Sequence, residues 1–114
     1  MWWGRDFDRP RAGTPWLPHA LANARSITTA DDDRLRVTTW TFQDGEDTGH
    51  HRHEYDYAVV PVTGGTFVVV DPDGATREMN QEAGVAYQGR AGTEHNVINR
   101  SGRTAIFVEL ELKR

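Results

Sequence analysis

The sequence predicts an all-β protein, built as an antiparallel sandwich or barrel. Short runs of strand-forming residues recur along the chain, and turn signals rich in glycine, proline and aspartate separate them at regular spacing. No segment shows the period of a convincing amphipathic helix. With 114 residues the chain is long enough for one hydrophobic core and too short for two, so we expect a single barrel domain.

The clearest strand is Leu35–Phe42, which alternates along its length. Side chains two residues apart on a strand point to the same face. Leu35 and Val37 therefore share one face, while Trp40 and Phe42 share the other. The second face carries the larger aromatic surface.

Further strands follow in order, after a first strand that starts near residue 26 and a turn at residues 43–49. We expect them at residues 55–62, 67–71, 76–79, 85–88, 95–98 and 104–112. The turns between them contain Gly64-Gly65, Pro72-Asp73-Gly74, Ala91-Gly92-Thr93 and Ser101-Gly102.

The first 24 residues differ from the rest. Residues 1–24 read as an irregular arm that carries Trp2, Trp3 and Trp16 among prolines and glycines, and residues 25–114 form the barrel domain. Aromatic side chains are enriched in interface cores. The arm must either wrap its own barrel or cross to a partner subunit, and we expect the second, a homodimer interface.

Composition excludes several classes of function. A net charge of −4 offers no basic surface for nucleic acid. The absence of cysteine excludes disulfides, thiolate nucleophiles and iron–sulfur clusters, and it agrees with a reducing compartment. Without a signal-peptide pattern or a long apolar run, we expect a cytoplasmic protein that does not bind membranes.

Two histidines two residues apart, His51 and His53, lie in a stretch that reads as strand, so both imidazoles should point to one face. A third, His95, opens a later strand. Three neutral imidazoles that converge inside a small β-structure can hold a divalent transition metal. Tyr57 has the same parity as the pair and should point inward beside it.

The spacing around these histidines resembles the two motifs of the cupin superfamily. The first motif, G-x5-H-x-H-x3-E-x6-G, matches Gly45, His51, His53 and Gly64, with Tyr57 in place of the glutamate. The second, G-x5-P-x-G-x2-H-x3-N, matches Gly84, Gly92, His95 and Asn99, with Arg90 in place of the proline. The sequence around both motifs is similar to a subgroup of small cupins labelled for β-alanine degradation.

This resemblance implies a cupin-type double-stranded β-helix, or jelly-roll barrel, with a metal held by His51, His53 and His95. The metal could be Fe, Mn, Ni, Cu or Zn, since all accept imidazole. Because Tyr57 replaces the glutamate, we expect its neutral hydroxyl to act in catalysis by donating a hydrogen bond. Glu54 and Asp56 remain alternative sources of a carboxylate ligand.

The function that these features favour is a three-histidine, metal-dependent oxygenase acting on a small organic molecule, with anionic substrates included. Arg90 is a candidate contact for an anion. Two alternatives stay open: a metal-dependent isomerase or lyase, and a non-catalytic cupin that binds a small molecule. A tethered DNA-binding domain would favour a regulator, and the sequence shows none.

Overall fold

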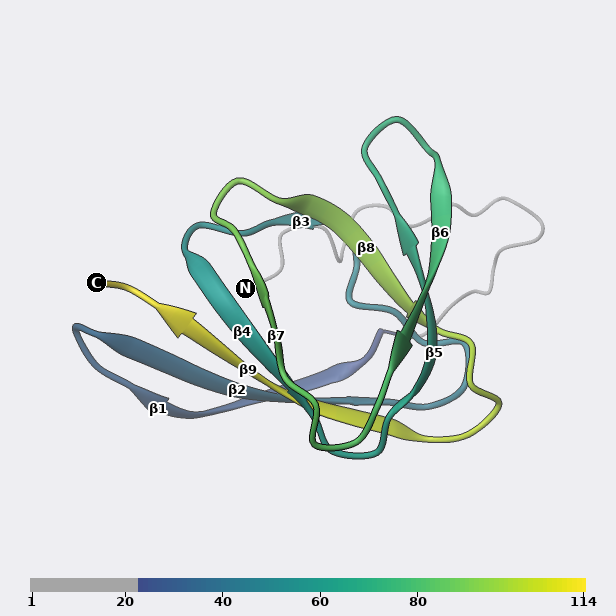
Figure 1. Cartoon of the computed structure of the whole chain (residues 1–114), viewed down its shortest axis with the longest axis horizontal. Coiled ribbons are helices and arrows are strands. Elements are labelled where there is room, and N and C mark those ends of the chain that lie inside the picture. Colours follow the sequence, from purple (N-terminus) through teal and green to yellow (C-terminus); the bar gives the residue numbers. More distant parts are fainter. Residues whose placement is uncertain (1–22) are drawn as a thin grey trace.

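The computed structural model describes residues 23–114, which form two antiparallel sheets that curve around a common interior (Figure 1). The five-stranded sheet has the order β1 (Arg25–Asp31), β2 (Leu35–Phe42), β9 (Ala105–Leu112), β4 (Asp56–Pro61) and β7 (Tyr87–Gly89). The four-stranded sheet has the order β3 (His51–Arg52), β8 (Glu94–Asn99), β5 (Gly65–Val70) and β6 (Thr76–Gln81). The antiparallel all-β architecture predicted from the sequence is confirmed.

The core is an aromatic cluster that joins the two sheets. Phe42 on β2, Phe67 on β5 and Phe107 on β9 lie with ring centroids 5.2–5.8 Å apart. All three are buried, and Trp40 extends the cluster from Phe42 along the inner face of β2. The two faces of β2 separate as the sequence predicted, and the structure shows that the aromatic face points inward.

A buried amide fastens one end of the barrel. Asn99, the last residue of β8, has no exposed surface, and its Nδ2 lies 2.7–3.3 Å from the carbonyl oxygens of Phe42, Gln43 and Arg103. Its Oδ1 accepts a hydrogen bond from the backbone N–H of Ser101. One side chain thus satisfies backbone groups from the end of β2 and from the β8–β9 turn.

The prediction that one continuous strand carries the histidine pair and Tyr57 was wrong. His51 and Arg52 form the whole of β3, residues 53–55 bend, and β4 begins at Asp56 in the other sheet. Burial still alternates through the bend, because His51, His53 and Tyr57 are all buried while the residues between them are more exposed. The inward direction was predicted correctly, although one strand does not carry all three residues.

The structure does not test the expectations about the N-terminal arm and its interface. The aromatic arm and the homodimer interface expected for it lie almost entirely outside residues 23–114, so they stay predictions. Within the described part of the chain, no helix is long and apolar enough to cross a membrane.

Asn99→Ala should destabilise the protein strongly, because it removes the donor for several carbonyl groups that are closed to water. We expect a loss of about 3 kcal/mol in the free energy of unfolding, measured by urea denaturation. The control is Asn80→Ala on β6, whose side chain makes one exposed hydrogen bond to Thr66. Equal losses in the two variants would show that Asn99 is not the fastening point.

Candidate metal centre

Three imidazoles come together because β3 pairs with β8. His51 and His95 are direct partners in the register of these two strands. His53 follows β3, and its backbone exchanges hydrogen bonds of 2.8 Å with Gly92 and Thr93 in the turn before β8. Backbone pairing therefore holds all three residues at the same end of the barrel.

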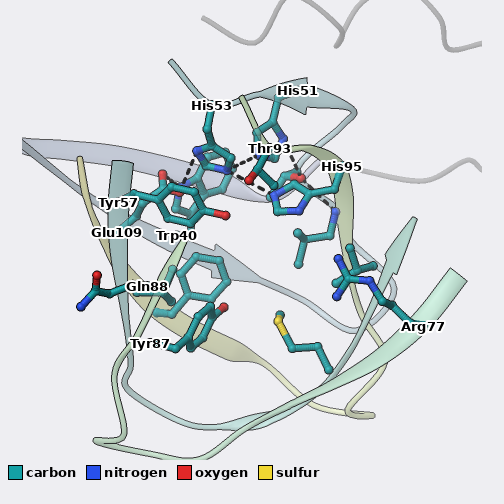
Figure 2. Close-up of a pocket in the computed structure, with 16 residues that line it drawn as sticks. Trp40, His51, His53, Tyr57, Arg77, Tyr87, Gln88, Thr93, His95 and Glu109 are labelled. Atoms are coloured by element: carbon teal, nitrogen blue, oxygen red, sulfur yellow. Dashed lines mark hydrogen bonds and ion pairs between the residues drawn. The ribbon is translucent and has the colours of Figure 1, made fainter. Parts of the chain in front are cut away.

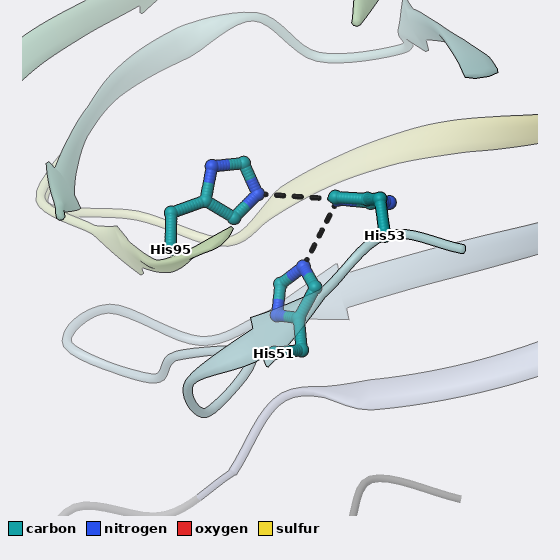
Figure 3. A group of neighbouring side chains, drawn as sticks. All are labelled: His51, His53 and His95. Atoms are coloured by element: carbon teal, nitrogen blue, oxygen red, sulfur yellow. Dashed lines mark hydrogen bonds between the residues drawn. The ribbon is translucent and has the colours of Figure 1, made fainter. Parts of the chain in front are cut away.

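The three rings present their Nε2 atoms to one another (Figure 3). His53 Nε2 lies 3.1 Å from His51 Nε2 and 3.2 Å from His95 Nε2. Metal–nitrogen bonds of about 2.0–2.1 Å, at ligand angles between roughly 90° and 109°, separate neighbouring nitrogens by about 2.9–3.4 Å. The spacing of the imidazoles fits one divalent ion.

The tautomer of His51 is set by its surroundings. His51 Nδ1 lies 2.9 Å from the carbonyl oxygen of Gly49, which can only accept a hydrogen bond. Nδ1 therefore carries the proton, and Nε2 is left with its lone pair directed at the other two rings. The hydroxyl of Thr48, 3.3 Å from the same Nδ1, supports this orientation.

Burial keeps the imidazoles neutral. It lowers the pKa of His51 to about 4, and it lowers the pKa of His53 and of His95 to about 3, with the neighbouring imidazoles as a further cause in the latter two. His51 and His53 are only 3% and 6% exposed, whereas His95 is partly buried. Neutral rings offer the lone pairs that a metal requires.

A buried carboxylate that sequence reasoning missed stands behind His53. Glu109 on β9 places Oε2 3.8 Å from His53 Nδ1, while its Oε1 lies 3.4 Å from the indole N–H of Trp40. Burial raises the pKa of Glu109 to about 7, and the charge of Glu111 adds to this shift. At 3.8 Å the contact is longer than a hydrogen bond. A carboxylate that hydrogen-bonds the far nitrogen of a ligating imidazole orients the ring and raises its basicity, and Glu109 is the one acidic group placed for that role among the residues that line the cavity.

The sequence did contain a signal for this residue. Glu109 lies two residues after Phe107, so it has the inward parity of the last strand, where an apolar residue is expected. A charged residue at an inward position requires a buried partner, and that requirement could have identified it.

Tyr57 stacks on one of the candidate ligands. Its ring lies 3.8 Å from that of His53, centroid to centroid, with 16° between the planes. Burial raises the pKa of the phenol, and a hydrogen bond with the side chain of Thr93 opposes this shift. The hydroxyl points toward the cavity in Figure 2, beside the histidines, and it stays protonated at neutral pH.

Gly89 provides the space in which the Tyr57 ring lies. The two residues are cross-strand partners on β4 and β7. A β-carbon at position 89 would overlap sterically with Cζ, Cε1 and the hydroxyl oxygen of Tyr57. Only glycine at this position permits the observed placement of the tyrosine.

The histidines stand at a cavity of about 250 Å³ inside the barrel (Figure 2). Apolar and aromatic side chains from both sheets make most of its wall, and polar or charged side chains, the three histidines included, make the rest. The lining comprises Trp40, Thr48, His51, His53, Tyr57, Val59, Val69, Arg77, Met79, Tyr87, Gln88, Thr93, His95, Val97, Phe107 and Glu109. A small molecule that enters this space would lie against the histidines and Tyr57.

Other sequence candidates lie outside this cavity. Glu54 and Asp56 are exposed, and Asp56 accepts a hydrogen bond from the backbone of Ala91 instead. Neither carboxylate lines the cavity, so neither replaces the missing glutamate. Arg90 is exposed and also does not line it. His50 is exposed as well, in agreement with its opposite strand parity.

An antiparallel two-sheet barrel with three converging histidines at its cavity defines a double-stranded β-helix protein with a candidate metal centre. Residues 38–111 match the family model of the cupin domain. The chain belongs to the cupin family, which confirms the fold that the two motifs predicted. It is 48% identical over 83 residues to a β-alanine degradation protein, BauB, of Pseudomonas aeruginosa, and the match covers 73% of this chain and 86% of that protein.

Solved structures agree with this assignment. A cupin domain from Bordetella pertussis is 40% identical, with a TM-score of 0.79 over 82% of this chain and 97% of that chain. The polyketide cyclase RemF from Streptomyces resistomycificus is 22% identical, with a TM-score of 0.61 over 83% of this chain and 70% of its own. At 22% identity, the similarity to RemF shows a shared fold and nothing more.

Removing two of the three imidazoles should abolish metal binding. The double variant His51→Ala/His95→Ala should contain background levels of metal, whereas the wild-type protein should hold about one divalent ion per chain by elemental analysis after zinc loading and dialysis. His50→Ala is the matched control, since this neighbouring histidine is exposed and does not line the cavity. A double variant with full metal content would place the metal elsewhere.

Gly89→Ala should displace the Tyr57 ring from its stack on His53. We expect a loss of about 1–3 kcal/mol in the free energy of unfolding, measured by urea denaturation. In a Tyr57→Val background, where the ring is absent, the same change should cost under about 0.5 kcal/mol, because the obstacle is gone. Additive losses in the double variant would show that the two residues do not interact as described.

Proposed function

We propose that this chain is a metal-dependent oxygenase that acts on a small organic acid or ketone. The observation that carries the proposal is the convergence of three neutral imidazoles on one point of a mostly apolar cavity, with no carboxylate among the converging atoms. Three protein donors leave open positions on a divalent ion. The cavity gives a small molecule a place beside them.

A metal bound there would supply Lewis-acid activation and, if it is redox-active, a means of electron exchange with oxygen. Three imidazoles can bind Fe, Mn, Ni, Cu or Zn, so the metal has to be identified by loading the protein with each in turn. Glu109 and the carbonyl of Gly49 would orient two of the three rings through their Nδ1 atoms.

Other residues of the chain would position the substrate. The apolar wall, which includes Val59, Val97 and Phe107, reduces the water content around a bound molecule. Tyr57 keeps its proton and would donate a hydrogen bond to a substrate oxygen, with Thr93 holding the phenol in place. The rigidity of the stack on His53 favours this role, because a donor that is already oriented needs no reorganisation.

A specific observation also supports a metal-dependent isomerase or lyase as the second candidate. Proton transfer in such reactions requires a carboxyl or imidazole group that can reach the substrate. Glu109 brings a buried carboxyl group into the cavity wall, a position that the sequence had not suggested. Product analysis separates the candidates, because isomerisation and cleavage proceed without oxygen.

The test is oxygen consumption by iron-loaded protein with a panel of small carboxylic acids and ketones. Iron-dependent uptake with one substrate class, absent in the His51→Ala/His95→Ala variant, is the expected result. Turnover that proceeds equally under anaerobic conditions would reject the oxygenase in favour of the second candidate. Absence of turnover in both atmospheres would reject both enzymatic proposals for the panel.

Tyr57→Phe should keep the metal and lose activity. Removal of the hydroxyl leaves the ring stacked on His53, so we expect metal affinity within about threefold of wild type. Loss of an oriented hydrogen-bond donor should lower kcat by roughly tenfold to a hundredfold, measured by oxygen uptake. Tyr55→Phe is the control, since Tyr55 does not line the cavity. Loss of metal together with activity would instead make Tyr57 a ligand.

A further inference from the structure

An arginine occupies an inward position of the four-stranded sheet. Arg77 on β6 is the cross-strand partner of Val69 on β5, and Val69 in turn pairs with Val97 on β8. Directly paired residues share a face of the sheet. Val69 is 1% exposed and Val97 is 5% exposed, so this face is the barrel interior. Arg77 therefore lies where strand periodicity calls for an apolar side chain.

Arg77 is the only lysine or arginine among the residues that line the cavity. Its charge acts on both sides of the site. Burial is the main cause of the lowered pKa of His95, and the charge of Arg77 is one of the smaller causes. The same charge opposes the rise in the pKa of Tyr57 that burial produces. Arg77 and Glu109, the one acidic lining residue, lie on opposite sides of the cavity in Figure 2.

The guanidinium is held loosely. Among residues 23–114, its one hydrogen bond is to Asp71 Oδ1 at 3.4 Å, well beyond the 2.7–2.9 Å that is usual between charged groups. Asp71 is one-third exposed, and the Arg77 side chain is 56% exposed, so the head group stands at the mouth of the cavity. A planar fork of N–H donors in this position matches a carboxylate better than it matches a neutral ligand.

We infer that Arg77 is the residue that selects the substrate of this site, by binding the carboxylate of a short-chain organic acid. The inference rests on the proposed function and narrows its substrate class from acids and ketones to acids. The apolar wall around Val59, Met79 and Val97 would hold the carbon chain, and the far end of the chain would lie toward the histidines. When ionised, Glu109 on the opposite side would repel a carboxylate and so disfavour the reverse orientation.

The experiment compares propanoate with its uncharged isostere propanamide, in metal-free and in zinc-loaded protein, by NMR titration. Wild type should bind propanoate at least about tenfold more tightly than propanamide. Arg77→Met keeps the length and apolar stem of the side chain and should weaken propanoate binding about tenfold in both forms, with propanamide binding unchanged. Arg100→Met is the matched control for net charge, because this exposed arginine lies beyond the opposite end of β8.

A second variant tests the same contact without removing the arginine. Asp71→Asn takes away the competing anion and should tighten propanoate binding about two- to threefold. The inference is overturned if wild type does not prefer propanoate, or if Arg77→Met binds it within twofold of wild type.

The metal-free titrations separate this result from the proposed function. If wild type fails to retain zinc, the metal centre is wrong while the selectivity of Arg77 is still measured. If zinc binds normally and Arg77→Met behaves as wild type, the metal centre stands and Arg77 is not the selector.

Discussion

The direct pairing of His51 with His95 across β3 and β8 is the constraint on which the rest of the site depends. β3 is only two residues long, so a shift of one position would turn His51 toward solvent and bring Arg52 inward. The backbone hydrogen bonds between His53 and the turn before β8 continue the β3–β8 register to the residue after β3. The backbone ladder thus fixes where the imidazoles meet before any ion is present.

Converging imidazoles place several polar groups in an environment that excludes water. Desolvation of this kind is unfavourable unless the groups find partners. For His51 the chain provides them on the outer side of the ring, through the carbonyl of Gly49 and the hydroxyl of Thr48. At His53 the carboxyl group of Glu109 lies 3.8 Å from the outer nitrogen, longer than a hydrogen bond. The inner nitrogens face one another instead, and an arrangement of lone pairs around one point is stabilised by a cation. Outer contacts and inner convergence together place three neutral imidazoles so that they could hold one metal ion at this end of the barrel.

The sequence predicted most of the fold and part of the site, and the difference has a physical reason. Features with a short-range pattern were found: the alternation of Leu35–Phe42, the turn signals, and the His51–His53 pair. Gly89 was not found, because its role comes from Tyr57 on a strand distant in sequence. Glu109 and Arg77 were missed although each has the inward parity of its strand, because a charged residue at an inward position shows its role only when the cavity around it is known. The break after Arg52 was also missed, since burial alternates through the bend as it would through a strand. How the strands pair and enclose the cavity, which a single sequence does not display, decided what each of these residues does.

The absence of a side chain at Gly89 imposes an order on how this site can change over generations. A mutation that adds a β-carbon at position 89 collides with the phenyl ring as long as Tyr57 is present. A mutation that replaces Tyr57 by a smaller residue causes no such collision, and glycine at position 89 is still tolerated. Lineages that depart from this arrangement would therefore lose the tyrosine first and the glycine second. The two positions should vary together, with tyrosine beside a larger residue as the missing combination.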